Sequence, residues 1–408
     1  MLTNNKHQQK NVLFISHIDA YPYKFGGQIG IFFPLIYFAN KCNVFFAFLT
    51  KDNTDYAKEK YKEFNIKPIP LVLNTEDNYF KYPLSMFSKL SFKFSKFYRK
   101  NFMEQLCNVI KNNDIDTVWC FAAQTSNYGV ELKKRFPHLK IYLREHNIEY
   151  KLVKQYSIGT TNLVMKLIAY YEYLKTKIYE INVWKKFDKV FFISDTDLAT
   201  AKKYNKNFDD SNLIYDGMQL CENNENIEVE KNSFIFTGSF TTFQNENNLK
   251  YFIKNIWIPF IQKVPDAKFY LTGNDDKILS QKLKIQKQEL EKYNIINLGF
   301  VNNIKKTILS KQYVISPTLY GSGIRLKVLE ALSLGKMVFV TDIDYTMSHL
   351  FEDKVNIIHY KDANDFYNKY IQINNDIDLQ EKIMCNAKQL IREYFSWNRY
   401  IERADILK

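Results

Sequence analysis

Short apolar runs, separated by polar and amphipathic segments, recur along the whole chain. Such runs occupy residues 11–16 (NVLFIS), 44–49, 118–121, 141–143 and 190–193 in the first half, and residues 234–239, 268–272, 295–300, 314–316 and 338–340 in the second. Runs of this length between turn-forming residues predict buried strands. The segments between them predict helices, most clearly over residues 162–186. The alternation predicts an α/β fold with parallel sheets.

A strand, a glycine turn, a helix and another strand are predicted in succession over residues 314–341. The first strand ends at Ser316, and residues 321–323 (Gly-Ser-Gly) form the turn. The helix covers residues 325–334, with apolar side chains on one face and Gly335 as the cap of its C-terminal end. This is a βαβ crossover with glycines where its helix begins.

The polar residues at the start of this helix predict an anion site. A glycine turn lets backbone N–H groups approach an anion closely, and the helix dipole adds partial positive charge. Arg325 and Lys327 lie in the first turn, where the dipole alone disfavours cations, so their position favours a bound diphosphate. Glu330, one turn further on, is expected to accept hydrogen bonds from sugar hydroxyls. An ordinary turn with solvated basic residues remains the alternative.

The complete string carries more information than its glycines alone. Gly-Ser-Gly-Ile-Arg-Leu-Lys-x-Leu-Glu-Ala, followed by Leu-Gly-Lys and an apolar strand, resembles the donor-binding segment of retaining GT-B glycosyltransferases of family 4. The resemblance implies two Rossmann-like domains whose parallel sheets face an interdomain cleft. It places an acceptor-side domain at residues 1–217, a nucleotide-sugar-binding domain at 218–390, and a helix at 391–408 that crosses back to the N-terminal domain. The strand-turn Leu213–Gly217 and the polar linker 221–231 mark the boundary.

Three further strings resemble the same family. Residues 144–149 (REHNIE) follow a predicted strand, at the edge of an open α/β sheet where ligands bind. Their His-Asn-x-Glu part resembles the family's histidine loop, although a surface-loop histidine remains the alternative. Gly26 and Gly27 resemble a loop close to the reacting sugar, before an apolar helix that Pro34 is expected to kink or delay. Residues 395–397 resemble the C-terminal signature.

The resemblance implies a complete set of site residues. Catalysis is assigned to His146, Arg325 and Lys327, and contact with the nucleotide sugar to Gly26, Gly27, Gly238, Ser239, Gly321, Ser322, Gly323, Ile324 and Glu330. No cofactor is expected beyond the nucleotide diphosphate sugar, which is a co-substrate.

The chain departs from the family pattern at two positions. Many members carry two glutamates separated by seven residues; Glu330 matches the second, and Ser322 stands at the first. Many also have an arginine after the glycine that ends the first strand of the second domain, where this chain has Ser239. Phosphate binding must then depend more on Arg325, Lys327 and backbone donors. The donor sugar is left open, and so is a non-catalytic member of the family.

No metal ligand set stands out in the sequence. Asp342-Ile343-Asp344 imitates the D-x-D of metal-dependent transferases, but it follows a strand in the wrong domain and is predicted to be a loop. Asn274-Asp275-Asp276 is predicted to be a solvated turn. A diphosphate held by arginine, lysine and a helix N-terminus has its charge offset without Mg²⁺, so metal-independent transfer is expected.

Composition narrows the class of protein further. With 408 residues and 46% apolar side chains, the chain is long enough for two domains with their own cores. The net charge of +13 favours acidic partners, but no nucleic-acid-binding module is recognisable. The five scattered cysteines predict free thiols in a reducing compartment. Neither a signal peptide nor a membrane-spanning run is recognisable, so a cytoplasmic location is expected.

A basic, aromatic segment runs from Ser85 to Phe102 and is predicted to be a single helix. Lys89, Lys93, Lys96 and Lys100 recur at spacings of four, three and four residues, with aromatic side chains on the adjoining face. Such a helix suits the surface of an anionic bilayer, as at the inner face of the cytoplasmic membrane. A structural helix that shows lysines to water remains the alternative.

The sequence favours one enzyme reaction over its rivals. The expected activity is transfer of a hexose-type sugar, with retention, from a nucleotide diphosphate donor to a glycan or lipid-linked acceptor in bacterial surface polysaccharide or glycoconjugate synthesis. The alternatives are a sugar-nucleotide epimerase of the same architecture, which would need a pair of acid/base carboxylates, and a basic nucleic-acid- or nucleotide-binding protein without catalysis.

Overall fold

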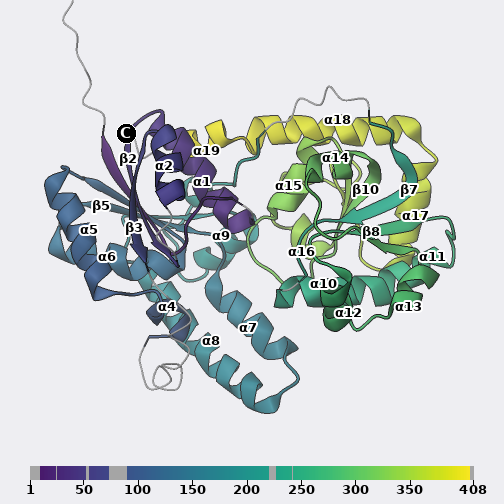
Figure 1. Ribbon diagram of the computed structural model, residues 1–408, viewed down its shortest axis with the longest axis horizontal. Coiled ribbons are helices and arrows are strands. Elements are labelled where there is room, and N and C mark those ends of the chain that lie inside the picture. The colour runs from purple at the N-terminus through teal and green to yellow at the C-terminus, as the bar shows by residue number, and fades with distance from the viewer. Residues whose placement is uncertain are drawn as a thin grey trace, which may run out of the picture. The chain divides into compact units, whose positions relative to one another are not determined.

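The computed structural model describes residues 10–23, 25–51, 55–72, 90–219, 227–240 and 242–404. The chain divides into two compact units, one of Met1–Tyr215 with Trp397–Lys408, the other of Asp216–Ser396. Each unit contains one six-stranded parallel sheet flanked by helices (Figure 1). In the parts of the chain so described, no helix is both long enough and apolar enough to cross a membrane.

The sheet of the first unit has the Rossmann strand order. Its strands, in the order β3-β2-β1-β4-β5-β6, are β1 (Asn11–Ser16), β2 (Asn43–Thr50), β3 (Ile66–Val72), β4 (Thr117–Phe121), β5 (Lys140–Glu145) and β6 (Lys189–Phe192). The order reverses between β1 and β4, and in open α/β sheets ligands bind outside the carboxyl ends of the strands at such a point. The loops after β1, β4 and β5 therefore meet at a favourable position.

The edge strand β3 is absent from the sequence prediction because it contains Pro68 and Pro70. Proline cannot donate a ladder hydrogen bond, so it lowers the strand signal. In a parallel strand the N–H groups of residues i and i+2 point to the same side. Because β3 pairs only with β2, the nitrogens of both prolines can face the open edge of the sheet, where no hydrogen-bond donor is needed.

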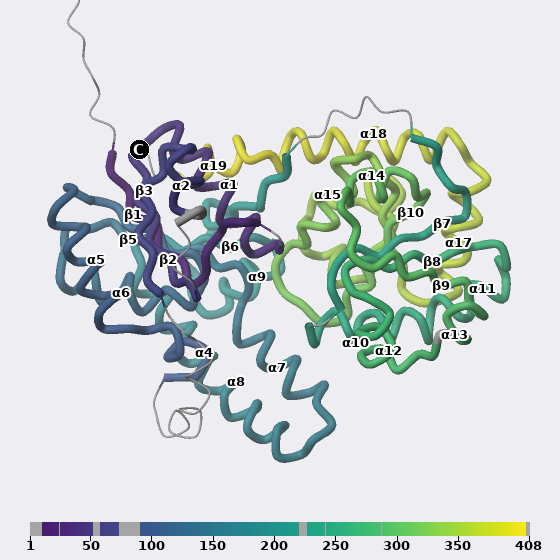
Figure 2. Tube along the Cα trace, viewed as in Figure 1, coloured from purple at the N-terminus to yellow at the C-terminus, as the bar shows by residue number. Residues whose placement is uncertain are grey.

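The helices of the first unit are α1 (Gly26–Ala39), α2 (Asp55–Glu63), α4 (Phe92–Ser95), α5 (Lys100–Asn112), α6 (Ser126–Arg135), α7 (Glu149–Gly159), α8 (Leu163–Trp184), α9 (Asp195–Lys202) and α19 (Trp397–Ala404). Helix α19 lies beside α1 in both views (Figures 1 and 2), and the ring of Trp397 stacks on that of Phe33 with centroids 5.7 Å apart. The last helix thus packs on the N-terminal unit. Helix α1 begins at Gly26, earlier than expected, and includes Pro34.

The prediction of a single helix from Ser85 to Phe102 is wrong for its described part. Helix α4 ends at Ser95, and α5 begins only at Lys100. The Tyr128 hydroxyl accepts a hydrogen bond from the Arg99 N–H (2.7 Å) and donates one to the Phe97 carbonyl (2.7 Å), which holds the break open. Lys93 forms an ion pair with Glu149. Residues 85–89 lie outside the described residues.

The second unit repeats the same strand order. Its strands, in the order β12-β11-β10-β7-β8-β9, are β7 (Glu230–Phe236), β8 (Lys268–Leu271), β9 (Ile295–Asn297), β10 (Lys311–Ser316), β11 (Met337–Val340) and β12 (Ile358–His359). The predicted linker 221–231 needs correction at its end, because Glu230 already pairs in β7; residues 221–226 lie outside the described residues.

Helices cover the second sheet on both faces (Figure 1). They are α10 (Phe243–Phe252), α11 (Ile258–Ile261), α12 (Asp276–Leu283), α13 (Lys287–Lys292), α14 (Ile304–Leu309), α15 (Leu326–Ser333), α16 (Asp342–Tyr345), α17 (Ala363–Asn374) and α18 (Ile377–Tyr394). The core is aromatic; the ring of Phe234 stacks on that of Tyr313 at 4.9 Å and meets Trp257 edge-on at 5.5 Å. This packing fixes the strand ends that carry the site.

Candidate active site

The glycine turn of the second unit lies between the end of β10 and the start of α15. Gly323 has φ +72°, a left-handed conformation that glycine adopts without strain. A Cβ on Gly321 would lie 1.3 Å from the guanidinium of Arg325, so a larger residue there would require that side chain to move. Ser322 and Ile324 are buried. The helix follows one residue later than predicted, with Arg325 at its N-cap.

Arg325 is held against the glycine turn by several acceptors. Its guanidinium donates to the carbonyls of Ser322 (3.3 Å) and Tyr320 (3.5 Å). Its Nε lies 3.6 Å from a carboxylate oxygen of Asp344. The side chain remains half-buried, so a positive charge is fixed at the start of α15, where the backbone N–H groups of the first turn also lie.

Asp344 is a site residue that the sequence did not identify. The Asp342-Ile343-Asp344 string is not the predicted loop but opens helix α16, and Asp344 is buried. Its Oδ2 accepts hydrogen bonds from the hydroxyls of Thr318 (2.8 Å) and Ser316. The carboxylate is thus committed to orienting the arginine and the end of β10. Its position four residues past the carboxyl end of β11 was the available signal.

Lys327 lies in the first turn of α15, beside the end of β7. Its Nζ is 4.0 Å from the centre of the Phe236 ring. Burial is the main cause that lowers the pKa of Lys327 to about 7; the charge of Asp344 opposes this shift, and that of Arg325 adds to it. The amine is therefore divided between its charged and neutral forms near neutrality, and an anion bound beside it would favour the charged form.

This pKa gives a testable expectation for nucleotide binding. At pH 8 the Lys327 amine is mostly neutral, because its pKa is about 7. A bound diphosphate raises that pKa, so binding at pH 8 should take up protons. Calorimetry in two buffers of different ionisation enthalpy measures the uptake. Lys327→Met should abolish it, and an uptake unchanged in that variant would show that another group titrates.

Two further predicted residues lie at the same edge of the sheet. Gly238 and Ser239 follow β7, and Gly238 has φ +119°. Gly273, with φ +104°, packs directly on them: a Cβ there would lie 2.7 Å from the carbonyl carbon of Gly238 and 2.8 Å from the Ser239 nitrogen. The contact between Lys327 and Phe236 joins this turn to the glycine turn.

Asn248 fixes the chain before the glycine turn, and Glu330 lies on the helix after it. The Asn248 side-chain oxygen accepts hydrogen bonds from the backbone N–H groups of Leu319 (2.9 Å) and Tyr320 (3.1 Å), which fixes the chain before the glycines. Sequence reasoning did not find this asparagine. Glu330 is half-buried on α15, and burial raises its pKa, opposed by Lys305. Its carboxylate lies on the same helix face as Lys327, three residues away.

The first unit has a separate cluster at the carboxyl end of β5. His146 follows that strand, and its Nε2 contacts the guanidinium of Arg144. Burial, Arg144 and His17 together hold the pKa of His146 well below its usual value. The imidazole is therefore neutral and accepts the hydrogen bond from Arg144. The sequence prediction ends the strand before Arg144, but Arg144 and Glu145 belong to β5.

His17 and Arg144 complete this cluster, and the sequence predicted neither as a site residue. Arg144 is buried, with its guanidinium 5.8 Å from the Phe121 ring centre and 5.4 Å from that of Tyr400. His17 follows β1, and burial lowers its pKa to about 4. Gly26 and Gly27 belong to the same unit, in the first turn of α1.

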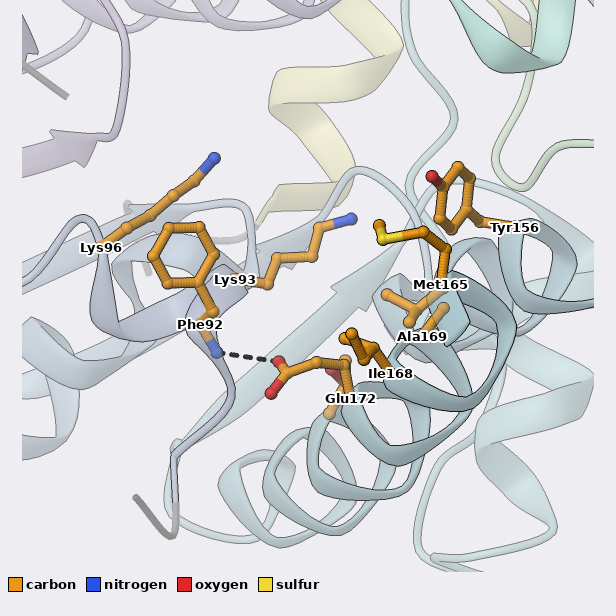
Figure 3. Close-up of a pocket in the computed structure, with 10 residues that line it drawn as sticks. Phe92, Lys93, Lys96, Tyr156, Met165, Ile168, Ala169 and Glu172 are labelled. Atoms are coloured by element: carbon orange, nitrogen blue, oxygen red, sulfur yellow. Dashed lines mark hydrogen bonds between the residues drawn. The ribbon is translucent and has the colours of Figure 1, made fainter. Parts of the chain in front are cut away.

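A pocket of about 240 Å³ lies beside this cluster, between α4 and the α7–α8 pair (Figure 3). Lys93 and Lys96 lie on one side, and Val153, Met165 and Ile168 on the other. Burial has the largest effect on the pKa of His17; Glu149 raises that pKa and both lysines lower it, each by less than burial does. The pocket therefore combines an apolar wall with two amines close to His17. The sequence predicted Lys93 and Lys96 on a bilayer-facing helix and not in a pocket, and it predicted none of the other lining residues as a site.

Potential metal ligands are dispersed in the part of the chain that the structure describes. No group of three or more His, Cys, Asp or Glu side chains is placed there to hold a metal ion. Asp275 and Asp276 are more than the predicted solvated turn, because Asp275 caps α12 by accepting from the Ile278 N–H (2.8 Å). Cys42, Cys107, Cys120 and Cys385 are free thiols.

Part of the chain matches a known protein family, and the structure is similar to solved structures over nearly its whole length. Residues 231–376 match the model of a family described as glycosyl transferases group 1. The matched segment contains the glycine turn, Arg325, Lys327 and Asp344. Over nearly all of both chains, 97% and 98%, the structure superposes on Anabaena Alr3699/HepE in complex with UDP, with a TM-score of 0.67 and 11% identity. The fold is GT-B.

Two further proteins are similar to this chain. A mutant of S. aureus TarM, in complex with fondaparinux, alpha-GlcNAc-glycerol and UDP, matches with a TM-score of 0.64 and 13% identity over 97% of this chain and 99% of that one. A Klebsiella pneumoniae protein described as an uncharacterized 44.6 kDa protein in the cps region is 23% identical over 266 residues. That match spans 62% of this chain and 64% of the relative.

Proposed function

We propose that the protein is a glycosyltransferase that moves a sugar from a nucleoside diphosphate donor to a glycan or lipid-linked acceptor, with retention, in the synthesis of a bacterial surface polysaccharide. The observation that carries the proposal is the fixed arginine and the titratable lysine beside a glycine turn, within the segment that matches the glycosyl transferases group 1 model. The relatives solved with UDP and the relative in a cps region support it.

In the second unit, residues are assigned to binding the donor and to stabilising the reaction. The diphosphate is assigned to Arg325, Lys327 and the N–H groups of residues 321–324, and the ribose to Glu330. Gly238 and Ser239 border the same edge. In the reaction the bond from the anomeric carbon to the phosphate oxygen breaks, and a bond to the acceptor oxygen forms as its proton passes to the departing diphosphate. Arg325 and Lys327 stabilise the charge that develops on the departing diphosphate.

The first unit is assigned to the sugar and the acceptor. A neutral His146, oriented by Arg144, is assigned to the reacting sugar, and Gly26–Gly27 are assigned to the same region. Such groups work by holding reactants in position.

A thermal-shift panel of nucleoside diphosphates and nucleotide sugars tests the proposal. A ligand that binds only the native state raises the unfolding temperature, and at 100 times its Kd the stabilisation is about 2.7 kcal/mol. We expect at least one nucleoside diphosphate and its sugar to do so, and the corresponding monophosphate to act more weakly. If no nucleotide shifts the transition, the proposed donor site is wrong.

Transfer should survive removal of divalent metals. Arg325, Lys327 and the helix N-terminus supply the positive charge that a metal would otherwise provide. The measurement is the initial rate of donor consumption in excess EDTA, with Mg²⁺ and Mn²⁺ add-back as the control. Complete loss of turnover that either metal restores would contradict metal independence.

A further inference from the structure

Helix α8 presents apolar side chains to solvent along most of its length. Val164, Leu167, Tyr171, Leu174 and Ile178, here called the α8 stripe, recur at spacings of three and four residues and so share one face. Their exposed fractions range from 40% at Leu174 to 65% at Val164. Large contiguous apolar surfaces are rarely exposed on monomeric proteins, and where they are exposed they often mark an interaction site.

The opposite face of α8 contains the acidic side chains. Glu180 is buried and accepts hydrogen bonds from the N–H groups of Glu149 (2.8 Å) and Tyr150 (2.9 Å), at the start of α7. Glu172 is buried, accepts from the Phe92 N–H (2.9 Å) and pairs with Lys175 (3.1 Å). These charges therefore point inward and apolar groups outward, the reverse of an ordinary surface helix.

The apolar surface continues to the end of the helical hairpin that α7 and α8 form. Ile158 at the end of α7 is 61% exposed, and Leu163 at the start of α8 is 69% exposed. In Figure 1 this hairpin projects away from the six-stranded sheet of its unit. Met165, also exposed, lines the pocket of Figure 3 on the other side of α8, together with Glu172. The exposed apolar surface thus covers the hairpin tip and the α8 stripe.

The exposed charged side chains of the α7–α8 hairpin itself are lysines. In residues 149–184, all of which the structure describes, the acidic side chains are Glu149, Glu172 and Glu180, and each is buried. The exposed charged side chains there, Lys154 and Lys166, are lysines; the exposed Lys185 and Lys186 follow, and then Asp188, which pairs with Lys133 (3.0 Å). An apolar stripe bordered by cations is complementary to a surface that is apolar inside and anionic outside.

We propose that the α7–α8 hairpin docks on an anionic lipid bilayer, with the α8 stripe at the acyl boundary and the lysines against the headgroups. The tyrosines of α8 have the amphipathic rings that favour this interface. A second copy of the chain fits less well, because the lysines bordering the two stripes would face one another. The docking stands independently of the proposed transfer reaction, and binding is measured without turnover.

Vesicle co-sedimentation of the protein tests the docking. We expect partitioning onto phosphatidylglycerol-containing vesicles to exceed that onto pure phosphatidylcholine vesicles by about tenfold or more, and to fall as salt is raised. The triple variant Leu167→Gln, Leu174→Gln, Ile178→Gln should lose at least about tenfold of this binding. The matched control is Val229→Gln, Ile371→Gln, Ile377→Gln, which changes three exposed apolar residues of the other unit and should bind like wild type.

Two results would overturn the docking. The first is equal binding to both vesicle types, or binding that the α8 triple variant leaves unchanged while circular dichroism shows it folded. The second is a wild-type dimer in sedimentation equilibrium without vesicles that the same variant converts to a monomer, because the stripe would then be covered by a second copy.

Discussion

Arg325→Ala is expected to weaken the binding of a nucleoside diphosphate by about tenfold or more. Charged hydrogen bonds to a buried phosphate contribute roughly 1.5–3 kcal/mol each, and about 1.4 kcal/mol corresponds to a factor of ten. The guanidinium is already oriented by the carbonyls of Tyr320 and Ser322 and by Asp344, so little ordering remains to be done on binding. Isothermal titration calorimetry measures the change.

Two companion variants separate recognition from folding. Arg325→Lys keeps a positive charge beside the buried Asp344 and should lose less affinity than Arg325→Ala, because only the planar fork is removed. Arg392→Ala changes an exposed arginine on α18 of the same unit and should bind like wild type. If Arg325→Ala is folded and binds the nucleoside diphosphate with unchanged affinity, the assignment of Arg325 to the donor site is wrong.

His146→Ala is expected to lower turnover by about a hundredfold while nucleotide affinity stays nearly constant. A positioned hydrogen-bonding or proton-transferring group contributes roughly 10²–10⁴-fold to rate in typical enzymes, and the lower end suits a neutral imidazole. The histidine lies in the first unit, whereas the diphosphate is assigned to the second. The effect should therefore appear in kcat and not in calorimetric binding.

The control and the pH profile sharpen this test. His138→Ala changes an exposed histidine of the same unit and should leave turnover unchanged. Because the pKa of His146 lies well below 6.5, the pH profile of wild-type turnover should contain no step near pH 6.5 that disappears in His146→Gln. If His146→Ala retains full turnover, the histidine is a structural partner of Arg144 only.

The architecture could be predicted because its strands carry strong local signals. The strand predicted at residues 11–16 forms β1 with the same bounds, and the helix predicted at residues 162–186 contains α8. What the sequence misses depends on context. Strand β3 is weakened by its prolines, and β12 consists of only two residues, Ile358 and His359, whose pairing depends on β11.

The grouping of the candidate site residues was predictable where they are local in sequence. The glycines, Arg325 and Lys327 lie within one short stretch, residues 321–327, so their proximity follows from the helix start itself. Asp344 joins the candidate site through Arg325 and through Ser316 and Thr318, which are 28 and 26 residues away. Arg144 is held there by the rings of Phe121 and Tyr400, which are also distant in sequence. Such long-range contacts leave no periodic signal.

The same dependence on long-range contacts explains what the sequence analysis missed in the surface helices. The lysine spacing from Ser85 to Phe102 suits one helix, but the hydroxyl of Tyr128 holds the backbone open between α4 and α5. Helix α8 has apolar residues on several faces. On its buried face, Glu172 accepts a hydrogen bond from the start of α4, and Glu180 accepts one from the start of α7. These two partner helices cannot be identified from the sequence of α8 alone.

Proton NMR of donor turnover tests the central claim most directly. The protein is incubated with each nucleotide sugar of the thermal-shift panel and a polysaccharide acceptor fraction, in EDTA, while the anomeric proton signals are followed. The account predicts that one donor is consumed, that nucleoside diphosphate is released, and that the first-formed product keeps the donor's anomeric configuration, with Arg325→Ala at least about tenfold slower. Consumption of no donor, or turnover that Arg325→Ala leaves unchanged, would contradict the transferase site; a product of opposite configuration would contradict retention.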